Sequence, residues 1–438
     1  MPEPYPIKIM SRFRPPPIPK RKTAATGLHA GRAQMQLESL AAQFRAAMAA
    51  ADFAHALQLA QTALARTPSN MTILGDYALC LMRTGRYEDA YRVYMQIHDT
   101  PPIHRARASA TWLDGLAEVC GWLGKHDELR HHGHRSLADA DEKFRHGPHW
   151  PLPAVPPRFD PDARTRNVIA YSLYGANPRY CETAVMNARV AHELYPAWTC
   201  RVYLDASVPE HVQRRLRDAG AELVAMDHDE RGAIPGTLWR FLVMDDPDVD
   251  RFIVRDADSL LSEREVGAVD EWLVSDRLFH HMRDYFTHTE LLLAGLWGGC
   301  TRVIPPITPL IFDFLANYRG PARFTDQQFL RTVLWPTVRE SIMNHDELFG
   351  FHDARPFPDH PPVRWRTDRF HVGSNTAYAS IGGPSSLPDG ARQPIALVRA
   401  GEPALAYDAL VRQNTWKLNL PFFLADEFRS GNLQVVTR

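Results

Sequence analysis

The sequence has few cysteines, and none of them forms a pair with redox or metal-binding spacing. Its five cysteines, an odd number, are scattered over 438 residues. This pattern argues against a disulfide framework and against a zinc ribbon. A reducing cytosol is the simplest compartment for such a chain, so the sequence predicts a cytoplasmic protein.

The chain also lacks long apolar runs and an excess of charge of one sign. No stretch of about 18 apolar residues suggests a transmembrane segment, and the N-terminus lacks the apolar core of a secretory signal. The formal net charge of −1 gives no global field that would attract nucleic acid. With 45% hydrophobic and 23% charged residues, the composition is typical of a globular protein with two or three domains.

Residues 1–32 form a segment rich in lysine, arginine and proline that contains a single acid, Glu3. We interpret it as a flexible basic arm. A solvated tail is the favoured reading. The alternative is contact with an anionic polymer or membrane, which would place the protein at the inner face of the membrane.

A repeat follows the arm. Residues 52–68 and 86–102 align at an offset of 34 residues, which is the tetratricopeptide period. Small Ala56 and Ala90 occupy equivalent positions and would let paired helices approach closely, and Gly85 would form the turn before the second unit. The pattern predicts an all-α array.

Residues 112–137 resemble a degenerate third repeat, which extends the expected array over residues 33–146. Such an array would recruit a protein partner. Several histidines lie near its end, and the i, i+3 spacing of His131 and His134 would allow a metal site. Without a cysteine or carboxylate partner in the pattern, a solvated helix face is favoured.

A proline-rich linker is expected over residues 147–165. Beyond it, apolar runs alternate with amphipathic segments, which predicts a mostly parallel sheet with helices on both faces. In such α/β folds, ligands bind beyond the carboxyl ends of the strands. The predicted strands are residues 168–174, 199–204, 221–226 and 251–254, and the predicted helices are residues 180–194, 209–219 and 237–244.

The fourth predicted strand leads directly into Asp256-Ala257-Asp258. Carboxylates at i and i+2 of an extended chain face the same side, and two adjacent anions repel unless a cation lies between them. A divalent cation, which takes oxygen ligands, would neutralise both carboxylates and could also bind a diphosphate. A D-x-D sequence alone is common, and an acidic loop capping the next helix is the alternative. Its position after a strand favours the metal site.

With these features the sequence resembles the GT-A glycosyltransferases over about residues 166–375. Three further segments carry the resemblance: residues 279–299, the acidic "FTDQQFL" of residues 324–330, and "RFHVGSN" of residues 369–375. The resemblance implies a Rossmann-like glycosyltransferase domain, here 166–384, and a D-x-D that chelates Mn²⁺ or Mg²⁺ and contacts a nucleotide-diphosphate sugar. Residues 385–438 would be a C-terminal extension with a helix at 404–414.

The same resemblance implies roles for single residues. Asp258 would be the main metal ligand, and Asp256 would bind the metal through water or hold the ribose or donor sugar. His371 would complete the metal site, although a structural histidine is an equal alternative. A nitrogen ligand favours Mn²⁺ slightly over Mg²⁺.

Other donor contacts are predicted by position. Arg240 would brace the diphosphate or Asp256, or else form a surface salt bridge with Asp245 or Asp246. Ser172 and Tyr174 end the first strand, and Asp205 ends the second, where base and ribose would lie. The residues predicted to contact the donor are Ser172, Tyr174, Asp205, Arg240 and Asp256.

The catalytic base of an inverting transferase would be a carboxylate. Asp326 is the first candidate and Asp284 the second. A helix N-cap role for Asp326 is the alternative. Two side-chain expectations complete the prediction. Of His280 and His281 on one strand, one is expected to face the core and the other solvent. A core position is favoured for Trp297, and stacking on a sugar ring is the alternative.

The sequence therefore predicts a metal-dependent glycosyltransferase that moves a sugar from a nucleotide-diphosphate sugar to a glycan, lipid-linked or protein acceptor. The alternative is a tetratricopeptide scaffold with a non-catalytic α/β domain. A metal-dependent nucleotidyltransferase ranks third, because "SLYGANPRY" after the first strand lacks a glycine-rich basic loop.

Overall fold

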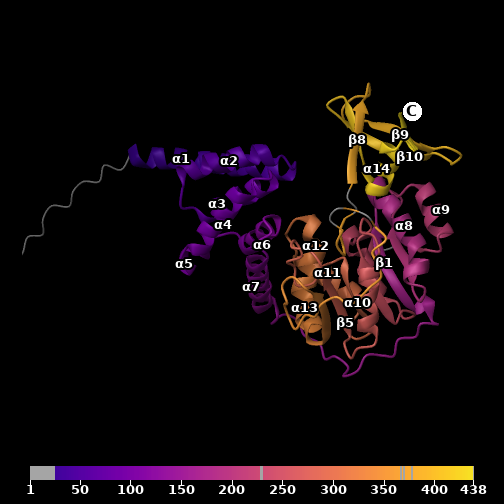
Figure 1. Ribbon diagram of the computed structural model, residues 1–438. Helices are drawn as coiled ribbons and strands as arrows, with labels where there is room; N and C mark the ends of the chain where they lie inside the picture. The colour runs from indigo at the N-terminus through magenta and orange to yellow at the C-terminus, as the bar shows by residue number, and fades with distance from the viewer. Residues whose placement is uncertain (1–24, 227–229, 366, 368–369, 376–377, 438) are drawn as a thin grey trace, which may run out of the picture. The chain divides into compact units, whose positions relative to one another are not determined.

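The computed structural model describes residues 25–226, 230–365, 367, 370–375 and 378–437 (Figure 1). Most of the expected basic arm, residues 1–24, lies outside the described residues. The chain divides into two compact units, Met1–Trp112 and Leu113–Arg438. None of the described helices is long and apolar enough to span a membrane.

The first unit is a helical array, as predicted. Helix α2 begins at Phe53 and α4 at Tyr87, at the repeat offset. Asp52 caps α2 by accepting a hydrogen bond from the His55 amide at 3.1 Å, and Asn70 caps α3 in the same way. The fully buried Ala56 occupies a helix contact where a larger side chain would not fit. The helices are α1 (Ala25–Ala49), α2 (Phe53–Arg66), α3 (Met71–Arg83), α4 (Tyr87–Asp99) and α5 (Pro102–Arg105).

The predicted third repeat corresponds to the helix pair α6 (Trp112–Trp122) and α7 (His126–Phe144), joined by a turn in which Gly124 has a φ of +69°. Helix α7 packs on the α/β part of the second unit. The Trp335 indole donates to Asp141 at 2.8 Å, and Arg339 donates to the same carboxylate at 2.9 Å. These hydrogen bonds attach the α6–α7 helix pair to the α/β domain that follows it.

The core of the second unit is a seven-stranded sheet of order β3-β2-β1-β4-β6-β5-β7. Strand β6 is antiparallel to both of its neighbours, and the other pairings are parallel. This confirms the predicted α/β class with a mostly parallel sheet. The strands are β1 (Asn167–Leu173), β2 (Thr199–Leu204), β3 (Glu222–Ala225), β4 (Arg251–Arg255), β5 (Phe279–Arg283), β6 (Leu296–Cys300) and β7 (Ile342–Asp346).

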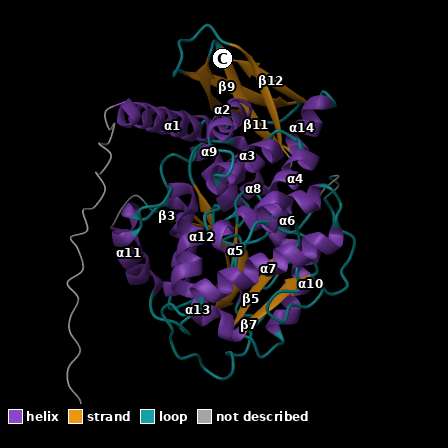
Figure 2. Ribbon diagram, turned by 90° about the vertical axis from the view of Figure 1, so that its left-hand side faces the viewer, coloured by secondary structure: helices purple, strands orange, loops and turns teal. Residues whose placement is uncertain are grey.

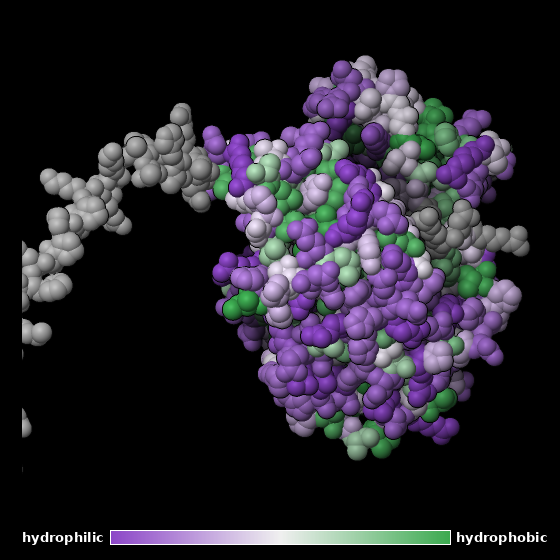
Figure 3. All heavy atoms as spheres, turned by 60° about the vertical axis from the view of Figure 1, so that its left-hand side comes forward, coloured by the Kyte–Doolittle hydropathy of each residue, from purple (hydrophilic) through white to green (hydrophobic). Residues whose placement is uncertain are grey.

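Helices cover the faces of this sheet (Figure 2), which is why its central strands are apolar along most of their length. The principal ones are α8 (Pro178–Leu194), α9 (Glu210–Asp218), α10 (Glu263–Leu273), α11 (Ile307–Asn317), the 3₁₀ segment η3 (Gly236–Asp245), α12 (Thr325–Phe329) and α13 (Trp335–Val338). The face drawn in Figure 3 is largely hydrophilic, with apolar side chains in small groups.

Both histidines of β5 are buried, so the expectation that one of them faces solvent was wrong. His280 stacks on Trp272 of α10 and lies 2.8 Å from His345 Nδ1. On the opposite face, His281 contacts Asn344 at 3.2 Å and accepts from the Leu293 amide. The cause is that β5 is an internal strand covered on both faces. Trp297 is buried, as expected.

The C-terminal part is a five-stranded antiparallel sheet of order β12-β9-β10-β11-β8 that packs with α14 and α8 (Figure 1). The helix predicted at 404–414 was wrong, because this segment is strand β10. Tyr407, Ala409 and Val411 are buried at every second position, which is the period of a strand. Gln413 and Asn414, both with positive φ, form the turn to β11. The elements are β8 (Tyr378–Pro384), β9 (Arg392–Arg399), β10 (Leu405–Arg412), β11 (Thr415–Pro421), α14 (Phe422–Arg429) and β12 (Leu433–Thr437).

Candidate functional site

A pocket of about 610 Å³ opens beyond the carboxyl ends of β1 and β4. Its walls come from segments far apart in the sequence. Seven of the predicted site residues line it: Ser172, Tyr174, Arg240, Asp256, Asp258, Asp326 and His371. The position agrees with the rule that α/β sheets bind ligands at this edge.

Arg240 joins two of the pocket carboxylates. Its Nη1 donates to Asp256 Oδ1, and its Nη2 donates to Asp326 Oδ2 at 3.1 Å. Its backbone amide donates to Ser172 Oγ at 3.0 Å, which ties η3 to the end of β1. The guanidinium is buried, and this contradicts the surface salt bridge with Asp245 or Asp246 that was the alternative.

Arg179, at the start of α8, holds the second D-x-D carboxylate. Its Nη2 donates to Asp258 Oδ2 at 2.6 Å, and its guanidinium lies 4.3 Å from the Tyr378 ring centroid. Burial raises the pKa of the Asp258 carboxyl, the Asp256 charge raises it further, and Arg179 lowers it. The two D-x-D residues therefore each have a guanidinium partner.

Asp326 is the second residue of α12 and lies mostly buried in the pocket wall. Burial raises the pKa of its carboxyl, Arg240 opposes that shift, and the Asp256 charge adds to it. Its Oδ1 accepts from the Gln327 amide at 2.9 Å. The N-cap of α12 is Phe324, so Asp326 does not have the capping role that was its alternative.

His371 also lines the pocket and stacks on Tyr285, with ring centroids 3.8 Å apart and an angle of 3° between the ring planes. Gly373 has a φ of +77°, so the 371–373 segment adopts a turn that favours glycine. His371 faces the same pocket as Asp256 and Asp258. Within the described residues, however, these three are not a group whose ligand atoms all lie within 4.8 Å of one another. Metal binding there stays a prediction.

Two predicted residues lie outside the pocket lining. Asp284 pairs with Arg264 at 2.9 Å and accepts from the Val372 amide at 2.9 Å, so it positions the segment that carries His371. Asp205 accepts from the Ser207 amide at 3.1 Å in the turn after β2. Neither carboxylate faces the cavity.

Sequence reasoning missed Tyr180 and Tyr285, which line the pocket, and Arg179, which binds the pocket residue Asp258. A signal for Arg179 was present. It follows Asn177 and Pro178, which together mark a helix N-terminus just after the first strand, and that end of a helix points toward the ligand-binding edge of the sheet.

Comparisons with known proteins give one sequence match and several distant structural ones. Residues 47–108 match the tetratricopeptide repeat model, so the first unit contains such repeats. No curated protein sequence matches the chain.

Among solved structures, an O-GlcNAc transferase mutant from Thermobaculum terrenum is 17% identical, covering 51% of this chain and 46% of its own, with a TM-score of 0.27. This chain thus spans less than half of that protein. A mannosyltransferase from Pyrobaculum calidifontis in complex with GDP-Man and Mn²⁺ is 14% identical, covering 54% and 67%, with a TM-score of 0.30. A glucosyl-3-phosphoglycerate synthase from Mycobacterium tuberculosis in complex with Mn²⁺ and UDP-glucose is 13% identical, covering 48% and 81%, with a TM-score of 0.28. At such values, activity has to be argued from the pocket itself.

Proposed function

We propose that the Leu113–Arg438 unit is a metal-dependent glycosyltransferase of the GT-A type that takes its sugar from a nucleotide-diphosphate sugar. The observation that carries the proposal is one pocket lined by three carboxylates, Asp256, Asp258 and Asp326, each of which accepts a hydrogen bond from a guanidinium group. Guanidinium groups bind phosphate oxygens, while carboxylates bind cations and sugar hydroxyls. A sugar linked to a diphosphate carries both kinds of partner.

The metal would be held by Asp258 and Asp256, with His371 as a nitrogen ligand. Carboxylate oxygens and one imidazole fit Mn²⁺ or Mg²⁺ by type. When bound, the ion supplies positive charge against the negative charge that develops on the leaving nucleoside diphosphate. Arg240 donates a hydrogen bond to Asp256 and so orients this carboxylate. Arg179 donates to Asp258, and it must share or release that carboxylate when the ion binds.

Aromatic residues at the pocket suit the nucleoside end of the donor. Tyr174 is 47% exposed and Tyr180 is 36% exposed, and both line the cavity near the end of β1. Exposed aromatic rings at a pocket offer faces on which a base or ribose packs. Ser172, at the strand end, is bound to the Arg240 amide and so fixes the distance between this wall and the carboxylates.

Asp326 is proposed as the group that accepts the acceptor's proton in an inverting reaction. Burial raises the pKa of its carboxyl, and this makes the carboxylate a stronger base than an exposed one. Its bond to Arg240 fixes it in the pocket wall. Asp284, which pairs with Arg264 outside the cavity, would instead act as a positioning residue.

The repeat unit supports a second function, the binding of a protein partner, since residues 47–108 match a tetratricopeptide model. We propose that it recruits an acceptor or an assembly partner to the transferase. Partner capture by the whole chain should then be lost on deletion of residues 1–112, while donor binding persists. If the deletion abolished both partner capture and donor binding, the result would count against separate functions for the two units.

The test of the donor proposal is a thermal-shift screen with UDP, GDP and CMP sugars, with and without Mn²⁺. We expect one nucleotide class to raise Tm only when Mn²⁺ is present. Asp258→Asn should abolish that shift, whereas Asp205→Asn, which changes a carboxylate outside the cavity, should retain it. No metal-dependent shift with any donor would refute the proposal.

A further inference from the structure

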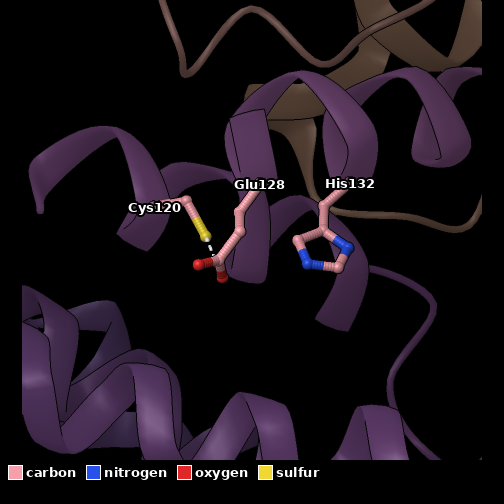
Figure 4. Close-up of side chains that lie close together, drawn as sticks. All are labelled: Cys120, Glu128 and His132. Carbon is pink, nitrogen blue, oxygen red and sulfur yellow. Dashed lines mark hydrogen bonds between the residues drawn. The ribbon is translucent and has the colours of Figure 1, made fainter. Parts of the chain in front are cut away.

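A second group of metal-ligating side chains lies away from the pocket, in the α6–α7 helix pair. The Cys120 thiol, the Glu128 carboxylate and the His132 imidazole each offer a ligand atom, and these atoms all lie within 4.8 Å of one another. Figure 4 shows the carboxylate between the thiol and the imidazole. Cys120 and His132 are buried, and Glu128 is half-buried.

The solvated helix face that the sequence favours for His131 and His134 agrees with their exposure. His131 is exposed, and His134 Nδ1 lies 3.0 Å from the Phe349 carbonyl oxygen. His132 instead meets the cysteine and the carboxylate that the sequence pattern did not reveal. The reason is that Cys120 is on the preceding helix.

Helix geometry explains how the three side chains meet. Glu128 and His132 are four residues apart on α7, so they lie on one face, about one turn from each other. The turn at Gly124 reverses the chain and brings the end of α6, with Cys120, onto that face. Two ligands thus come from one helix and the third from its partner.

We propose that Cys120, Glu128 and His132 bind a Zn²⁺ ion, with water in a fourth position. Thiolate and imidazole ligands favour zinc among the common divalent ions, and a carboxylate oxygen is a usual third ligand. Bond lengths of about 2.0–2.3 Å place tetrahedral ligand atoms roughly 3.3–3.8 Å apart. The Cys120 Sγ–Glu128 Oε2 separation is 4.0 Å, so only a small side-chain movement closes that side of the site.

The surrounding charges are compatible with this ion. Lys125 Nζ donates to Glu128 Oε1 at 3.2 Å, while Glu128 Oε2 faces the thiol. The lysine would therefore remain an outer partner that orients the carboxylate. A cysteine thiol has an ordinary pKa of about 8.5, so the free thiol is protonated at neutral pH. Zinc binding would form a Zn–S bond and release that proton to solvent.

The ion would cross-link the helix pair that is packed on the α/β domain. Gly121, next to Cys120, lies against Phe286, where a Cβ atom would come within 2.2 Å of the ring. Gly133, next to His132, meets Phe349 in the same way. Because the site lies between these contacts, bound zinc should raise the thermal stability of the second unit.

The experiment uses the metal-free full chain, titrated with Co²⁺ and then with Zn²⁺. Co²⁺ bound by a thiolate gives a charge-transfer absorption in the near ultraviolet, which the carboxylates and His371 of the pocket cannot produce. We expect the band to saturate at one equivalent, to disappear on addition of Zn²⁺, and to accompany the release of one thiol proton.

Matched variants locate the site. Cys120→Ser should abolish the band. Loss of a residue that only hydrogen-bonds to a metal ligand weakens metal binding ~10–100-fold, and His132→Gln should weaken Co²⁺ binding by more than this because it removes a ligand. His131→Gln, at the adjacent exposed position, and Cys200→Ala, a thiol in the sheet core, should retain it. Circular dichroism of each variant establishes that it is folded. No thiolate band in the wild-type chain, or a band that persists in folded Cys120→Ser, would overturn the proposal.

Discussion

Replacing Arg240 with methionine would leave Asp256 and Asp326 in one pocket without the guanidinium that joins them. The two contacts differ in their surroundings. The Asp326 side chain is 10% exposed and that of Arg240 is 5% exposed, whereas the Asp256 side chain is 47% exposed. Solvent screens the Asp256 pair to about 0–1 kcal/mol. The buried Asp326 pair should therefore dominate the loss.

The expected destabilisation by Arg240→Met is about 3 kcal/mol, the lower end of the range for breaking a buried ion pair. A double-mutant cycle with Asp326→Asn isolates the pair, and we expect a coupling free energy of roughly 2 kcal/mol, because hydrogen bonds to charged groups contribute about 1.5–3 kcal/mol. The penalty should be smaller at acidic pH. Without Arg240 the pKa of Asp326 rises further, and protonation below that pKa removes the uncompensated charge.

The assay is urea unfolding of the wild-type chain, both single variants and the double variant, under metal-free conditions. An unchanged m-value in all four proteins would show that the variants expose the same surface on unfolding. A coupling below ~0.5 kcal/mol would refute the reasoning, since distant or solvent-screened pairs behave that way.

Two further predictions concern buried groups of the second unit. Burial raises the pKa of the Asp114 carboxyl to about 7, above its value in the unfolded chain, so the free energy of unfolding should fall as pH rises toward 7. Asp114→Asn should remove a contribution of ~1.4 kcal/mol per pH unit to that slope between about pH 4 and 7. Equal slopes in the wild-type and Asp114→Asn proteins would count against the prediction. Gly295→Ala would place a Cβ atom 2.1 Å from Asp256 Oδ2 and should lower donor affinity at least ~10-fold through displacement of that carboxylate. Gly267→Ala, on α10, where the added Cβ atom would lie 3.3 Å from Pro358 Cγ, is the matched control and should leave donor affinity unchanged.

Local patterns were sufficient to predict the first four strands of the sheet. The segment around β1 is a short apolar run with turn residues on both sides, and the observed strand differs by a single residue at each end. Strand β2 agrees at both ends. Such runs are informative because β1, β2 and β4 are buried along most of their length and are bounded by helices whose ends are marked by proline or glycine.

Segments whose apolar residues fit both the helical and the strand period were not predictable in this way. In β10, exposed Leu410 lies between buried Ala409 and Val411, so the apolar residues do not alternate strictly and the segment also fits a helix. Pairing with β9 and β11 decides the outcome, and those pairings are long-range properties of the fold.

The candidate site was predictable as a set of carboxylates with Arg240 beside Asp256. The Asp258–Arg179 and Asp326–Arg240 pairs were not predicted. Asp258 and Arg179 are 79 residues apart, and Arg240 and Asp326 are 86 residues apart. No local spacing connects such pairs. The same applies to Cys120, which meets its two partners across a helical turn.

The central claim is that the pocket uses Asp258 to turn over a nucleotide-diphosphate sugar. Its most direct test is release of nucleoside diphosphate from the donor selected by the thermal-shift screen, measured with Mn²⁺ for the wild-type chain, Asp258→Asn and Asp205→Asn. The account predicts release by the wild-type and Asp205→Asn proteins, at least ~100-fold slower release by Asp258→Asn, and loss of release on chelation. Equal rates in the wild-type and Asp258→Asn proteins would contradict it.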